Sequence, residues 1–93
     1  MVRFSVIIPT LNEEQNIKEC LESLHEQDTD ETYEIIVADS NSEDNTKLIS
    51  NKYADKVINC GKGISVGRNS GAKVADGEIL VFIDADSIAS PHL

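Results

Sequence analysis

The sequence predicts an α/β fold in which a Rossmann-like parallel sheet of about four strands carries helices on both faces. Short apolar runs alternate with amphipathic helical patterns along all 93 residues, and such alternation is typical of parallel strands joined by right-handed crossovers. The runs are almost continuously apolar, as strands covered on both faces are. Aromatic residues make up only 4% of the chain, so the core is expected to be aliphatic.

The first strand is predicted over Phe4–Ile8 and is expected to end at Pro9, which lacks a backbone donor. Asn12 can cap a helix that continues to about Gln27. One face of that helix carries an apolar stripe at i, i+3, i+4 and i+7, namely Ile17, Cys20, Leu21 and Leu24, which is the spacing of a buried helix face. Asp28–Thr32 is predicted to be a polar connection.

A second strand is predicted over Tyr33–Ala38. Ser42 is expected to cap the following helix, which carries the apolar residues Leu48, Ile49 and Tyr53. Lys56–Asn59 is predicted to be a short third strand.

The third helix is predicted over Ile64–Ala75, and its small residues would allow close packing: Gly67, Gly71, Ala72 and Ala75. Ile79–Ile83 is five apolar residues long and is predicted to be a fully buried fourth strand. Ser90-Pro91 has the chemistry of a helix start.

Charge and composition exclude several functions. The net charge is −9, which argues against nucleic acid and against an anionic membrane surface. An acidic chain can still bind an anionic ligand through a divalent cation. Val6–Ile8 is too short an apolar run for a signal peptide, and no apolar window is long enough for a membrane helix, so a cytoplasmic location is expected. Cys20 and Cys60 lack the spacing of a metal or disulfide motif.

Polar residues follow each predicted strand, and ligands of parallel sheets bind at the carboxyl ends of strands. Asp84 and Asp86 follow the fourth strand. In an extended chain both side chains would point the same way, giving two hard oxygen ligands suited to Mg²⁺ or Mn²⁺. The sequence has a second pair with this spacing, Asp28 and Asp30, which is predicted to lie in a solvated loop.

Four blocks together resemble the family 2 glycosyltransferases, which have the GT-A fold. They are Val6–Glu14, Glu34–Thr46, Gly67–Ala72 and Leu80–Asp86, and they occur in the family's order over nearly the whole chain. The order of all four blocks is far more specific than any single motif. The resemblance implies a nucleotide-sugar site and a sheet order of 3-2-1-4.

The resemblance also implies roles for individual residues. Pro9, Thr10 and Glu13 would border the nucleoside, and Asp39 would pair with its base, commonly uracil. A carboxylate there can accept a hydrogen bond from a ring N–H.

At the phosphate end, the resemblance implies that Arg68 lies near the nucleotide. Its guanidinium could meet phosphate or stack on a base. Asp84 would approach the ribose, and Asp86 would hold the metal on the diphosphate. Lys62 is expected to be a solvated loop residue.

The resemblance also sets an expectation for activity. In the family, the acceptor-binding half and the catalytic base follow the metal motif, whereas only seven residues follow Asp86 here. Residues 1–93 are therefore expected to form a single nucleotide-binding domain that is truncated after the metal motif. It would bind UDP or a related nucleotide sugar with Mn²⁺ or Mg²⁺ and would be inactive alone, with no catalytic residue of its own.

Two other functions stay open. A nucleotidyltransferase-like domain could share the architecture, but it would need a basic, glycine-rich loop after the first strand, where Thr10–Glu14 is acidic. A non-catalytic nucleotide-binding or interaction module is the other alternative. The fourth strand would have an open apolar edge, which is a template for pairing, so a homodimer through this strand is also expected.

Overall fold

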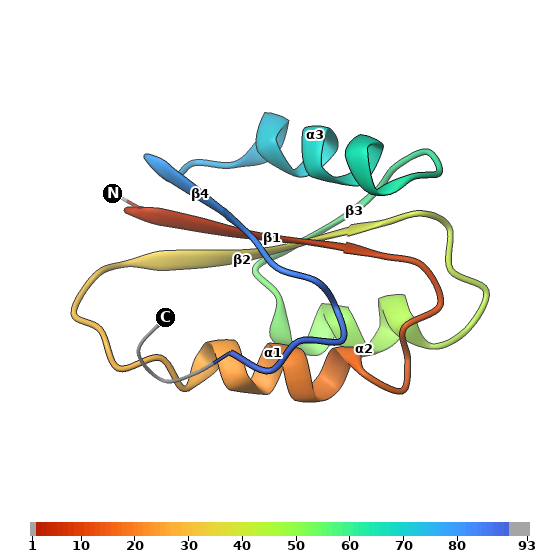
Figure 1. Ribbon diagram of the computed structural model, residues 1–93, viewed down its shortest axis with the longest axis horizontal. Helices are drawn as coiled ribbons and strands as arrows, with labels where there is room; N and C mark the ends of the chain where they lie inside the picture. Colours follow the sequence, from red (N-terminus) through yellow and green to blue (C-terminus); the bar gives the residue numbers. More distant parts are fainter. Residues whose placement is uncertain (1, 90–93) are drawn as a thin grey trace.

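The centre of the molecule is a parallel sheet of four strands in the order β3-β2-β1-β4, as predicted. The computed structural model describes residues 2–89. The elements follow one another as β1 (Phe4–Thr10), α1 (Ile17–His25), β2 (Tyr33–Asp39), α2 (Thr46–Tyr53), β3 (Lys56–Asn59), α3 (Ile64–Val74) and β4 (Ile79–Phe82). Helices α1 and α2 cover one face of the sheet and α3 covers the other (Figure 1).

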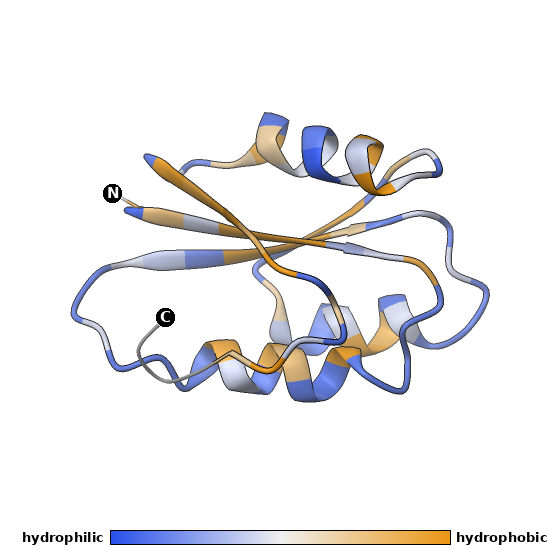
Figure 2. Cartoon of the chain, in the orientation of Figure 1, coloured by the Kyte–Doolittle hydropathy of each residue, from blue (hydrophilic) through white to orange (hydrophobic). Residues whose placement is uncertain are grey.

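The larger core lies between the sheet and α1. The buried residues of this cluster include the predicted helix stripe and alternate residues of the two central strands: Val6, Ile8, Ile17, Cys20, Leu21, Leu24, Ile35, Val37 and Ala85. Figure 2 shows the central stretches of the strands in the hydrophobic colour. The prediction that Cys20 packs in an aliphatic core is confirmed.

Helix α3 lies close against β1, as its small residues predicted. A Cβ atom added to Gly71 would lie 2.5 Å from Cγ2 of Ile7, and one added to Gly67 would lie 2.9 Å from Cβ of Pro9. Any larger side chain at these positions would therefore push the helix away from the sheet.

The prediction that Pro9 ends the first strand is wrong, because β1 continues to Thr10. The Thr10 carbonyl accepts from Ser40 on the β2 side, and the Ile7 carbonyl accepts from Ile83 on the β4 side. Since alternate residues of a strand bond to opposite neighbours, Pro9 faces the β4 side, where the ladder has already ended at Ile7. Its missing N–H costs no ladder hydrogen bond at such a position.

The predicted helix caps Asn12 and Ser42 are also wrong. Helix α1 begins at Ile17 and α2 at Thr46. Asn12 has a positive φ of 53°, whereas an N-cap residue usually has extended backbone. Instead, the backbone N–H of Asn12 donates to the Ser42 hydroxyl, with 2.8 Å between the two heavy atoms.

One expectation about burial is wrong. Strand β4 was expected to be fully buried, but Ile79 is 39% and Phe82 is 44% exposed. Within residues 2–89 no strand pairs with the outer side of β4, so this edge faces solvent. The predicted helix start at Ser90-Pro91 lies outside the described residues.

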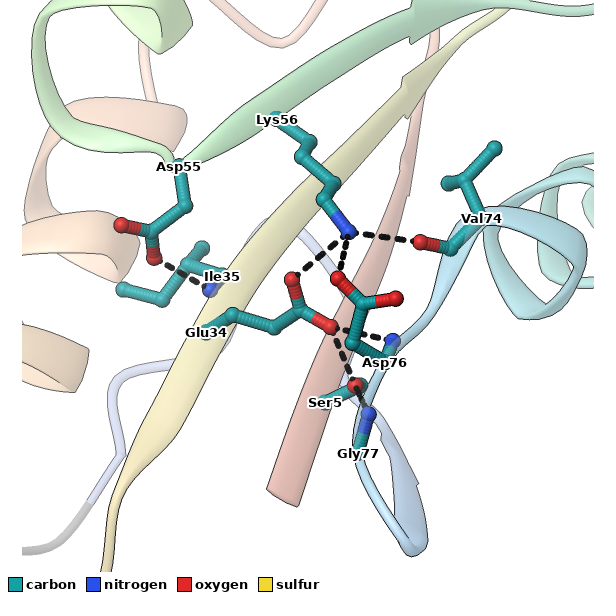
Figure 3. A network of polar contacts seen from close by, with 8 residues as sticks. All are labelled: Ser5, Glu34, Ile35, Asp55, Lys56, Val74, Asp76 and Gly77. Atoms are coloured by element: carbon teal, nitrogen blue, oxygen red, sulfur yellow. Dashed lines mark hydrogen bonds and ion pairs between the residues drawn. The ribbon is translucent and has the colours of Figure 1, made fainter. Parts of the chain in front are cut away.

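A polar network closes the end of the sheet where the strands begin (Figure 3). The buried Glu34 carboxylate accepts from the Ser5 hydroxyl at 2.6 Å and from the Asp76 N–H at 2.7 Å. The ammonium of Lys56 lies 3.0 Å from Glu34 and 2.8 Å from the Asp76 carboxylate. The Gly77 N–H donates to the Ser5 hydroxyl. These contacts fix the crossover from α3 into β4.

No helix within residues 2–89 combines the length and the apolar character that crossing a membrane requires.

Candidate functional site

The carboxyl ends of β1, β2 and β4 surround a pocket of about 400 Å³. Five of the sequence-predicted residues line it, namely Pro9, Thr10, Glu13, Asp84 and Asp86. The other lining residues, for which the sequence predicts no individual role, are Leu11, Ser40, Gly63, Ile64 and Ala85. The pocket therefore lies where ligands of parallel sheets bind.

Asp84 and Asp86 border the pocket from a turn rather than from an extended strand. The Ser87 N–H donates to the Asp84 carbonyl at 3.0 Å, which closes a tight turn. Ala85 between them is buried in the α1 core, whereas both aspartates are exposed. The expectation that Asp84 and Asp86 lie in an extended chain is wrong. Both aspartates nevertheless line the pocket, one on each side of the buried Ala85.

The donor set of the pocket fits a Mg²⁺ or Mn²⁺ ion that is coordinated partly by the protein and partly by a substrate. Such ions take one or two carboxylates and fill their other positions with water and substrate phosphates. Asp84 and Asp86 could supply the two carboxylates, and residues 2–89 contain no group of three potential ligands that would enclose an ion completely. Together with Glu13 they make the described pocket lining acidic, without any basic side chain.

The Cys20 thiol lies behind this turn. Its Sγ donates to the Asp84 carbonyl at 3.8 Å. Burial, together with the nearby charges of Asp86 and Glu13, raises the pKa of Cys20 to about 11. The thiol is therefore protonated at neutral pH, which suits a packing residue rather than a metal ligand or a nucleophile.

Asp39 lies beneath the pocket and not in its lining. It is fully buried. One carboxylate oxygen accepts from the Thr10 and Ser42 hydroxyls, both at 2.6 Å, and the other accepts from the Ser42 N–H at 2.8 Å. These bonds join the ends of β1 and β2. In this conformation the pocket is lined by Leu11 and Ser40 but not by Asp39.

Arg68 lies beside the pocket on α3. Its guanidinium carbon lies 5.7 Å from the centre of the Phe82 ring, within the range of a cation–π contact. Arg68 lines a second hollow of about 280 Å³, whose lining includes Asp84 as well. The two hollows thus meet at Asp84. Lys62 is exposed in the loop before α3, as expected.

The sequence pattern of the family described as Glycosyl transferase family 2 matches residues 5–93. The uncharacterized glycosyltransferase YfnE of Bacillus subtilis is 39% identical over 98 residues, which cover 99% of this chain and 25% of that protein.

Solved structures of glycosyltransferases are also similar to this chain. Staphylococcus aureus TarS, residues 1–349 in complex with UDP, has a TM-score of 0.86 and 35% identity, covering 98% of this chain and 29% of that one. The mannosyltransferase PcManGT of Pyrobaculum calidifontis, in complex with GDP-Man and Mn²⁺, has a TM-score of 0.80 and 32% identity, covering 92% and 28%. The predicted fold class is confirmed, and the chain spans about a quarter of the length of these relatives.

Proposed function

The chain belongs to glycosyl transferase family 2, and from this premise we propose that its pocket binds the nucleoside diphosphate of a nucleotide sugar through a divalent cation. UDP or a closely related nucleotide is the proposed donor nucleotide, and Mn²⁺ or Mg²⁺ is the proposed ion. These residues would form the nucleotide-binding domain of a transferase that uses this nucleotide sugar as its donor.

The acidic lining of the pocket carries this proposal. Asp84, Asp86 and Glu13 border the same cavity, and no basic side chain of the described residues lines it. A diphosphate would be repelled by this surface unless a cation lay between the two. A bound divalent ion would also stabilise the negative charge that develops on the leaving diphosphate.

Each residue of the site has a proposed role. Asp86, together with Asp84, would hold the ion, and Asp84 would also approach the ribose. The lining segment Pro9–Glu13 would border the nucleoside. Asp39 would meet the base, for which its fully buried carboxylate must become accessible to a ring N–H. Arg68, whose hollow meets the pocket at Asp84, would lie near the phosphates.

We propose further that residues 1–93 form one nucleotide-binding domain without transferase activity of their own. The relatives that bear glycosyltransferase names are several times longer. Sugar transfer also needs an acceptor site and, for inversion, a carboxylate base, and we assign neither to a described residue. Turnover of a nucleotide sugar by the purified 93-residue chain would contradict this proposal. Binding without turnover even in a longer chain would favour a non-catalytic module.

Titration calorimetry with UDP tests the nucleotide site. We expect binding in Mn²⁺ or Mg²⁺ that is lost in EDTA and lost in Asp86→Ala. Asp30→Ala is the matched control, because Asp30 belongs to the exposed pair of the same spacing and its loss should leave the affinity unchanged. Binding of UDP that ignores EDTA, or that Asp86→Ala leaves intact, would contradict the metal role. GDP in place of UDP tests the choice of base.

We also propose that β4 pairs with β4 of a second copy. Its outer edge is apolar and exposed, and within residues 2–89 nothing pairs with it. Two antiparallel copies related by a twofold axis would satisfy both edges equally.

A further inference from the structure

Asn12 joins the loop after β1 to the loop after β2. Its side-chain Oδ1 accepts from the Glu43 N–H at 2.9 Å, and its own N–H donates to the Ser42 hydroxyl at 2.8 Å. One residue thus makes two hydrogen bonds to the neighbouring loop in opposite directions. The predicted role of Asn12 as the N-cap of α1 does not explain these two hydrogen bonds.

The backbone of Asn12 restricts which residues can replace it. Its φ is 53°, in the left-handed region that glycine adopts freely and that asparagine and aspartate tolerate better than other residues. Asparagine therefore combines the backbone conformation with the acceptor that Glu43 needs. Glycine would keep only the conformation, and aspartate would keep both.

The contacts of Asn12 continue into the floor of the pocket. Ser42, which accepts from Asn12, donates to Asp39, and Asp39 also accepts from Thr10. The next residue, Glu13, is held in the same way, because its N–H donates to the buried Thr46 hydroxyl at 2.8 Å.

Asn12 acts on the pocket through its neighbours. It is exposed and does not line the cavity, but the residues on either side of it, Leu11 and Glu13, both do. A side chain in this place can fix the shape of the lining without contacting a ligand.

We infer that Asn12 is a positioning residue that holds the pocket-lining segment Leu11–Glu13 in its binding conformation through the Oδ1–Glu43 hydrogen bond. The inference rests on the proposed nucleotide site, and it adds a residue that sets nucleotide affinity from outside the pocket. Freeing the loop would require the nucleotide to order it on binding, which lowers affinity.

Three variants separate the hydrogen bond from the backbone conformation. Asn12→Gly removes the acceptor and retains the backbone conformation, and Asn12→Asp restores the acceptor. Asn41→Gly is the matched control, because Asn41 lies in the partner loop with a similar φ of 58° and is exposed. Calorimetry with UDP and Mn²⁺, well below the unfolding temperature, gives the affinity of fully folded protein in each case.

We expect Asn12→Gly to weaken UDP binding about three- to tenfold, the range for one hydrogen bond. Asn12→Asp and Asn41→Gly should bind like the unchanged chain. Equal affinity of Asn12→Gly and Asn41→Gly would overturn the inference, and so would failure of Asn12→Asp to restore binding.

Hydrogen exchange without nucleotide gives an independent readout. Asn12→Gly should speed exchange of the Glu43 and Glu13 amides, whereas Asn41→Gly should not change the Glu13 amide. Unchanged exchange in Asn12→Gly would overturn the positioning role. If the unchanged chain fails to bind UDP with Mn²⁺, the proposed function fails together with the effect on affinity, while the exchange data still decide whether Asn12 fixes the loop.

Discussion

Glu34 and Lys56 form an ion pair at the end of the sheet opposite the pocket, with 3.0 Å between Oε1 and Nζ. The glutamate side chain is almost completely buried, and the lysine side chain is about one-third exposed. The same carboxylate also accepts from Ser5 and from the Asp76 N–H. The start of three strands and the entry to the fourth are thus held by one charged group (Figure 3).

We predict that Glu34→Gln lowers the free energy of unfolding by about 2 kcal/mol, the size expected when a buried, hydrogen-bonded charge pair loses one charge. Urea unfolding at neutral pH measures the effect. Arg3→Gln is the control, because the Arg3–Glu78 pair is about half exposed on both sides and should contribute less than about 1 kcal/mol. Equal effects of the two substitutions would contradict the structural role of Glu34.

Glu34 also predicts an acid-dependent loss of stability. Burial by itself would raise its pKa, but hydrogen bonds from Ser5, Asp76 and Lys56 outweigh burial and hold the pKa below the ordinary glutamate range. The unfolded chain therefore takes up this proton at a higher pH, near the ordinary value of about 4.3. The stabilisation is present above that pH and is lost as pH falls through the lower, folded pKa.

Urea titrations between about pH 7 and about pH 3 test this dependence. The chain with Glu34→Gln should lose stability less steeply on acidification than the unchanged chain. Burial would raise the pKa of Asp44, but hydrogen bonds from Thr46 outweigh burial and lower it. Asp44 should therefore contribute part of the dependence of stability on pH in both proteins. If stability fell equally steeply on acidification in the two proteins, Glu34 would be excluded as a source of the pH dependence.

We predict that Gly71→Ala destabilises the fold by about 1–3 kcal/mol, which is the usual effect of overpacking a core. The new Cβ would lie 2.5 Å from Cγ2 of Ile7, which is fully buried on a central strand and cannot move aside. Gly61→Ala is the matched control, since its Cβ would meet Val66 at an ordinary 3.6 Å. Thermal unfolding that shows no difference between the two would mean that α3 packs less closely than the structure indicates.

We predict that the 93-residue chain associates through the outer edge of β4. Sedimentation over a range of concentrations should show dimers, and Ile79→Lys should restore the monomer by placing a charge on the exposed strand. Leu48→Lys is the control, because Leu48 is exposed on α2 rather than at the sheet edge. A monomer at high concentration, or equal behaviour of the two lysine variants, would contradict pairing through β4.

Much of the fold was predictable because it depends on local patterns. The Ile17-to-Leu24 spacing fixed the buried face of α1, and the glycines of α3 indicated its close approach to β1. Helix starts were less predictable: Asn12 and Ser42 have capping chemistry, but they bond to each other across two loops. A contact between residues 30 positions apart leaves no periodic signal in the sequence.

The sequence by itself determined that strands would alternate with helices and that polar residues would end each strand, because periodicity and turn chemistry are local properties. It also placed Asp84 and Asp86 at the end of β4. Only the tertiary structure decided that Glu13 joins them around one pocket while Asp39 lies beneath it and Arg68 beside it. Those positions depend on strand pairing and on which side chains find hydrogen-bond partners across loops, and such long-range contacts form only when the chain is packed.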